Sequence, residues 1–102
     1  MRIQIIGDGM EINDHIRDLI EDKLGSQLDK LLKDFDRDIK TAKVRIREHP
    51  EGYEVSFEMH LPGKKHIFAE RVSDRLTLAF TELRESVERQ LERYRGDLMY
   101  GR

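Results

Sequence analysis

The chain has 102 residues, which is enough for one domain with one hydrophobic core. It has no cysteine, so disulfides, thiolate metal sites and cysteine nucleophiles are excluded. The formal net charge of −2 excludes a globally basic protein, although 19 Lys and Arg leave room for a local basic patch. No apolar run approaches the length of a membrane span and the N-terminus is too polar for a signal peptide, so we expect a cytoplasmic protein without membrane contact.

The first third of the sequence predicts a strand and then a helix. Residues 2–6 are rich in isoleucine and precede the turn signal "GDG", which is typical of a short strand. From Asn13, a candidate N-cap, to Phe35 the apolar residues recur at helical spacing. The apolar stripe shifts after Leu24 and Gly25 interrupts it, so we predict an irregularity near Gly25.

The middle of the chain predicts a β-hairpin. Apolar and polar residues alternate over residues 42–46 and again over 53–61, which indicates one buried and one wet face. If Glu48 pairs with Tyr53 across the "HPEG" loop, cations of one strand lie opposite acidic or polar residues of the other: Arg47 and Glu54, Arg45 and Ser56, Lys43 and Glu58. The wet face then neutralises itself and is a poor surface for anions.

The last part predicts a strand over residues 65–72 and a second long helix. Ser73 or Asp74 is the expected cap, an apolar stripe runs to Tyr94, and Gly96 supplies the stop. We therefore predict an α+β fold of order β-α-β-β-β-α: a two-layer, four-stranded sheet with both helices packed on one face. It forms a single domain over residues 1–102, with a flexible tail from about residue 97.

Catalytic and metal chemistry find little support in the sequence. The four histidines, His15, His49, His60 and His66, form no HxxxH or HxH pair, so we predict no metal site and interpret His60 as a wet-face strand residue. The "GDG" turn lacks the patterns of phosphate-binding loops. The carboxylates lie on predicted wet faces among basic residues, so we expect neither an enzyme nor a cofactor.

Basic residues gather on helix flanks beside the apolar stripes. One flank of the first helix carries Lys23, Lys30 and Lys33. One flank of the second helix carries Arg75, Arg89 and Arg93. Arg84 and Arg95 lie on the other flank of the second helix. Two interpretations stay open. In the first, the cations border the buried stripes and keep their charged ends in water. In the second, the basic flanks of the two helices face each other and form a positive groove suited to phosphate.

The order of these elements, together with several short strings, resembles one known family. The strings are "IQIIGDGMEINDHIRDLIEDKL", "HPEGYEVSFEMHLPGK", "FAE", Ala79–Phe80 and "ERQLERYR". They resemble the ribosome hibernation-promoting factor and ribosome-associated inhibitor family, also called protein Y or sigma-54 modulation proteins, and the resemblance runs from Arg2 to about Arg95. It implies the fold predicted above.

The resemblance also implies a function. A member of this family binds the small ribosomal subunit and its rRNA in the mRNA–tRNA channel, blocks tRNA and idles ribosomes under stress, without catalysis, cofactor or small-molecule substrate. Lys23, Arg89 and Arg93 match basic positions of the family, and the two later lysines match approximately because the first helix carries one extra residue after Leu24. The predicted nucleic-acid-binding residues are Lys23, Lys30, Lys33, Arg75, Arg89, Arg93 and Arg95.

Some positions depart from the family pattern. The family often has lysine where this chain has Ser86 and near Ser26, and it commonly opens the second helix with Asp-Met-Tyr where Arg75-Leu76-Thr77 stands here. An alternative function therefore stays open: an RNA-binding or protein-interaction module of the same fold that has lost ribosome inhibition. The chain looks like a short or divergent form, or an N-terminal fragment of a long one.

Overall fold

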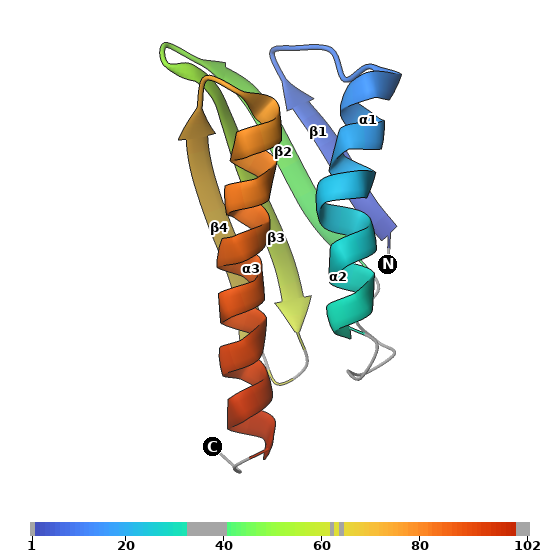
Figure 1. The fold of residues 1–102 in the computed structure, drawn as a ribbon, viewed down its shortest axis with the longest axis vertical. Helices are drawn as coiled ribbons and strands as arrows, with labels where there is room; N and C mark the ends of the chain where they lie inside the picture. The colour runs from blue at the N-terminus through green and yellow to red at the C-terminus, as the bar shows by residue number, and fades with distance from the viewer. Residues whose placement is uncertain (1, 33–40, 62, 64, 100–102) are drawn as a thin grey trace.

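Four strands form one mixed sheet in the order β1-β2-β3-β4 (Figure 1). The computed structural model describes residues 2–32, 41–61, 63 and 65–99. The strands are β1 (Arg2–Asp8), β2 (Thr41–His49), β3 (Gly52–Leu61) and β4 (Lys65–Ser73). Strand β1 pairs with β2 in parallel, and the other two pairs are antiparallel. The four predicted strands are confirmed, and β4 lies at one edge of the sheet.

The β2–β3 hairpin has the predicted register. Glu48 pairs with Tyr53, so each expected pair of cation and acidic or polar residue lies directly across the ladder. Alternate residues point to one face and are buried there, as a period of two requires: Ala42, Val44, Ile46, Val55, Phe57, Met59, Leu61, Ile67 and Ala69. The other face of the sheet is the wet face.

Both helical segments cover the buried face of the sheet (Figure 1). The first comprises α1 (Asp14–Ile20), the π-helical turn η1 (Glu21–Gly25) and α2 (Ser26–Leu32), and the second is α3 (Leu76–Met99). Asn13 caps α1 as predicted, because its Oδ1 accepts a hydrogen bond from the Ile16 N–H at 2.9 Å. The predicted two-layer α+β architecture is therefore confirmed.

The irregularity predicted near Gly25 is the π-helical turn. Both the backbone N–H and the Oγ of Ser26 donate to the carbonyl oxygen of Glu21, the latter at 2.9 Å. A bond spanning five residues accommodates one more residue than an α-helical turn does. Leu24 and Leu28 on either side of the turn's end consequently both reach the core.

The core lies between the sheet and the helices. Its helical part comes from the two predicted apolar stripes, whose buried members are Ile16, Ile20, Leu24, Leu28, Ala79, Phe80, Leu83, Val87, Leu91 and Tyr94. No polar or charged residue among those described is classed as buried. Functional chemistry must therefore be sought on the surface.

The predicted stop of the second helix is wrong. Helix α3 continues through Gly96 to Met99, because Gly96 does not adopt the left-handed backbone by which glycine ends helices. The expected tail from about residue 97 therefore begins inside a helix, and residues 100–102 lie outside the described part. Phe35 and Lys33, which belong to the predicted first helix, also lie outside the described part.

Candidate nucleic-acid interface

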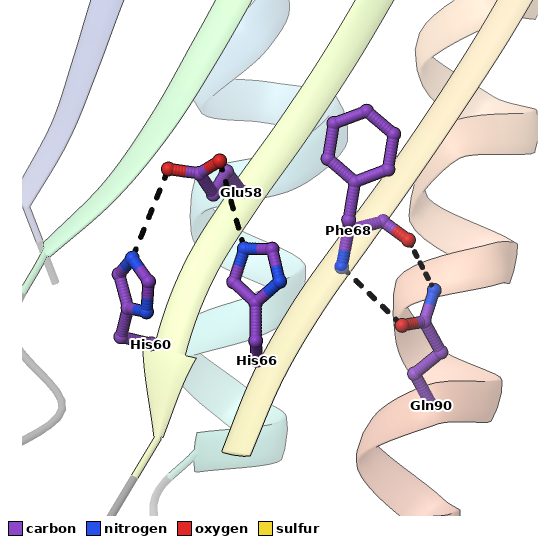
Figure 2. A network of polar contacts seen from close by, with 5 residues as sticks. All are labelled: Glu58, His60, His66, Phe68 and Gln90. Carbon is purple, nitrogen blue, oxygen red and sulfur yellow. Dashed lines mark hydrogen bonds and ion pairs between the residues drawn. The ribbon is translucent and has the colours of Figure 1, made fainter. Parts of the chain in front are cut away.

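The contacts of the Gln90 side chain show which flank of α3 faces the edge strand. Its Nε2 donates to the carbonyl oxygen of Phe68 at 2.8 Å, and its Oε1 accepts from the N–H of Phe68 at 3.4 Å (Figure 2). Phe68 lies on β4, so the flank that carries Gln90 faces the outer edge of the sheet.

Arg93 lies on this same flank. Three residues correspond to about 60° around an α-helix, and Arg93 lies on the side of Gln90 away from the buried stripe. It lines a surface hollow between α3 and β4 together with Lys65, His66, Gln90 and Tyr94. Two cationic residues, Lys65 and Arg93, therefore share one hollow. Lys65 was not among the predicted residues, since only the tertiary structure brings it beside Arg93.

Two further predicted arginines continue from this hollow. Arg89 is exposed and lies about 40° around α3 from Arg93, one turn earlier. Arg75 is also exposed and precedes the first residue of α3, five turns or about 27 Å before Arg93. Arg89 and Arg93 are close enough to act on neighbouring phosphates, whereas Arg75 could reach only a different stretch of backbone.

The other flank of α3 faces the first helical segment. Helix α3 contacts η1 and α2, and the two segments run side by side across the sheet (Figure 1). Arg84 lies about 120° from Gln90 and pairs with Glu88, the Nε and carboxylate oxygen being 3.3 Å apart. Arg95 is exposed on this flank, on the opposite side of the buried stripe from Arg93. The Arg89–Arg93 flank therefore does not face the first helical segment across a common groove.

Two of the three predicted lysines of the first helical segment lie on η1 and α2, and the third, Lys33, lies outside the described residues. Lys23 is half-buried on η1, with its Nζ 3.8 Å from a carboxylate oxygen of Asp22, and Lys30 is exposed on α2. Acidic residues are interleaved with the cations on both helical segments. The helical layer therefore offers local basic sites, the hollow beside Arg93 among them, rather than a uniformly positive face.

The wet face of the sheet is charge-compensated, as predicted. Arg47 forms an ion pair and hydrogen bond with Glu54 across the β2–β3 ladder. The hydrogen bond and the charge of Glu54 raise the pKa of Arg47 above its ordinary value. The charge of this arginine is neutralised by a carboxylate, which weakens its attraction for a phosphate.

The structure brings together two histidines that spacing along the chain kept apart. The β3–β4 register places His60 directly opposite His66, and Glu58 lies two residues earlier on the same face of β3 (Figure 2). His60 is exposed on the wet face, as expected. The pairing was missed because only spacings within one element were considered; a hairpin turn between the two histidines was the signal that could have revealed it.

Comparisons with known proteins agree with the fold. The profile of a family described as sigma 54 modulation protein / S30EA ribosomal protein matches residues 3–99. The Protein Y N-terminal domain from Thermus thermophilus is a similar solved structure, with 29% identity, a TM-score of 0.75, and coverage of 92% of this chain and 99% of that one. A ribosomal subunit interface protein from Coxiella burnetii shows 26% identity and a TM-score of 0.75, covering 94% of this chain and 99% of that one.

No curated protein matches the chain. Among the described residues, no helix is both long enough and apolar enough to cross a membrane.

Proposed function

Since the chain belongs to the sigma 54 modulation protein / S30EA ribosomal protein family, we propose that it inhibits translation by occupying the mRNA–tRNA channel of the small ribosomal subunit. The family supports the broader part of this statement, a ribosome-associated role and the cytoplasmic location that goes with it. Contact with rRNA, the channel and a role in the stress response are the proposed parts. No catalytic step is assigned to the chain.

The observation that carries the proposal is the hollow shared by Arg93 and Lys65. A cationic side chain from α3 and one from β4 converge there, and Arg89 lies one turn of helix away. Arginine and lysine heads held in this way fit the phosphates of an RNA backbone. Phosphate contacts position a protein without reading bases, which suits a factor that blocks a channel.

Co-sedimentation with purified small ribosomal subunits tests the proposal. We expect the wild-type chain to pellet with the subunits at low salt and to be released as salt rises. The double variant Arg89→Glu/Arg93→Glu should lose most of this binding, and the slope of log affinity against log salt should fall by roughly one for each phosphate contact removed.

The matched control is Lys43→Glu/Arg45→Glu. It makes the same change in net charge on the opposite, charge-compensated face of the sheet. We expect it to bind subunits nearly as the wild type does, and circular dichroism should show both variants folded. Equal loss in the two variants would indicate a general effect of net charge, and wild-type chain that stays in the supernatant at low salt would refute the proposal.

One feature of α3 favours a second candidate function, a protein-interaction module that has lost ribosome inhibition. Glu82, Glu85 and Glu92 are interleaved with the arginines, and Ser86 stands where the family often has lysine. A surface of mixed charge fits a protein partner better than an RNA backbone. This function predicts that the chain shows no salt-sensitive binding to RNA and leaves in vitro translation uninhibited.

A further inference from the structure

We propose that Glu58, His60 and His66 form a binding site for a divalent transition-metal ion on the wet face of the sheet. The three ligating side chains come from neighbouring positions near the end of β3 and the start of β4 (Figure 2). Their candidate ligand atoms all lie within 4.8 Å of one another. His66 also lines the hollow beside Arg93, but its imidazole faces Glu58 and His60, and ion binding does not depend on ribosome binding.

The distances fit a single small ion. The carboxylate Oε1 of Glu58 is 3.8 Å from Nε2 of His60, and its Oε2 is 3.5 Å from Nε2 of His66. Two donors held about 2.0–2.1 Å from a tetrahedral zinc ion lie about 3.3 Å apart. The two separations between Glu58 and the histidines exceed this value by a few tenths of an ångström, and all three candidate ligand atoms lie within 4.8 Å of one another, so a common ion requires the two farthest atoms to approach by up to about 1.5 Å. Rotation of these exposed side chains allows such a shift.

The chemistry of the donors indicates the class of ion. Two imidazole nitrogens and one carboxylate suit Zn²⁺, Ni²⁺ or Cu²⁺, whereas Mg²⁺ and Ca²⁺ prefer oxygen ligands. Both histidines present Nε2 to the carboxylate, so the metal-bound form carries its imidazole protons on Nδ1. With three protein ligands, one coordination position stays open to water or to another molecule.

Neighbouring groups set the orientation and the strength of the site. His60 and His66 stack with ring centroids 4.8 Å apart, and the ring of Phe68 stacks on the other side of His66 with centroids 6.5 Å apart. Lys43 on β2 pairs with Glu58, and its positive charge weakens the binding of a metal ion beside that carboxylate. Because the side chains are also 40% to 78% exposed, we expect an ion to bind reversibly rather than to be a permanent part of the fold.

Calorimetric titration of Zn²⁺ into the full chain, purified without a histidine tag, tests the site. We expect one ion per chain and at least a tenfold loss of affinity in the double variant His60→Ala/His66→Ala. The matched control is His15→Ala/His49→Ala, which removes the same number of imidazoles from outside the cluster and should leave the affinity unchanged. Glu58→Gln should weaken binding as well, because it removes the only anionic ligand.

The outcomes distinguish a specific metal site from incidental binding of zinc to surface histidines. Equal affinity in the wild type and the His60/His66 variant, or one ion per two chains, would overturn the proposal. A measurement on the wild type alone guards against variants that fail to fold. In histidine side-chain NMR spectra, one equivalent of Zn²⁺ should move the Nε2 resonances of His60 and His66 and leave those of His15 in place, whereas equal changes at all histidines would refute the site.

Discussion

The carboxamide of Gln90 binds both backbone polar groups of Phe68, a residue 22 positions earlier in the chain. It accepts from the N–H and donates to the carbonyl oxygen on the open edge of β4, where a further strand would otherwise pair. The contact therefore covers part of an exposed sheet edge. It also lies on the flank of α3 that carries Arg93, which lines one hollow with Lys65.

Replacing Gln90 by leucine, a side chain of similar size, should weaken the contact between α3 and β4. Two hydrogen bonds are lost, so we expect the free energy of unfolding to fall by roughly 1–2 kcal/mol, measured by urea denaturation. The more specific measurement is hydrogen exchange at the amide of Phe68, which should become faster. Gln27→Leu, on α2, is the control and should leave that amide protected; unchanged exchange in Gln90→Leu would contradict the role given to this contact.

The two flanks of α3 should differ in their contribution to ribosome binding. Arg93→Gln removes a cation from the hollow beside β4, whereas Arg84→Gln removes one that already pairs with Glu88 on the other flank. We expect Arg93→Gln to lower the salt slope of subunit binding by about one, and Arg84→Gln to leave it nearly unchanged. The reverse result would move the interface to the flank that faces the first helical segment.

Lysine at position 86 should strengthen binding. Ser86 is half-buried one turn before Gln90, on the flank that carries Arg93, with its Oγ 3.5 Å from the Nε2 of Gln90. Ser86→Lys would add a cation next to the hollow, so we expect higher affinity for small subunits at low salt and a steeper salt dependence. Ser56→Lys, on the wet face of the sheet, is the control; an equal gain there would indicate that net charge alone is responsible.

Two glycines should respond in opposite directions to alanine. Gly25 has no left-handed backbone, and the three atoms nearest to an added Cβ, at 2.7 Å, belong to the flexible carboxylate end of Glu21, which can move aside, so Gly25→Ala should stabilise the fold by up to about 1 kcal/mol. Gly52 has a φ of +126°, and its Cβ would meet backbone atoms of Ser73 and Asp74, so Gly52→Ala should destabilise. Thermal unfolding of both variants checks the pair, and a destabilised Gly25→Ala would show that the π-helical turn cannot accept a side chain.

Local sequence patterns were sufficient for much of the fold. Alternation over residues 42–46 and 53–61 predicted the hairpin, and the position of its loop predicted the pairing of Glu48 with Tyr53. These patterns are reliable because a strand must bury every second residue and a helix one stripe, whatever lies elsewhere in the chain. The end of α3 was not predictable in this way, because a glycine ends a helix only where the backbone turns left-handed, which Gly96 does not do.

Patterns along the chain were enough to place the strands, the helical stripes and the arginines on each flank of α3. They did not reveal that the Gln90 flank faces β4, that Lys65 lies beside Arg93, or that His60 lies opposite His66. The difference lies in the range of the interactions. Periodicity follows from backbone geometry within one element, whereas the rotation of a helix and the neighbours of a surface side chain depend on contacts between residues far apart in the chain.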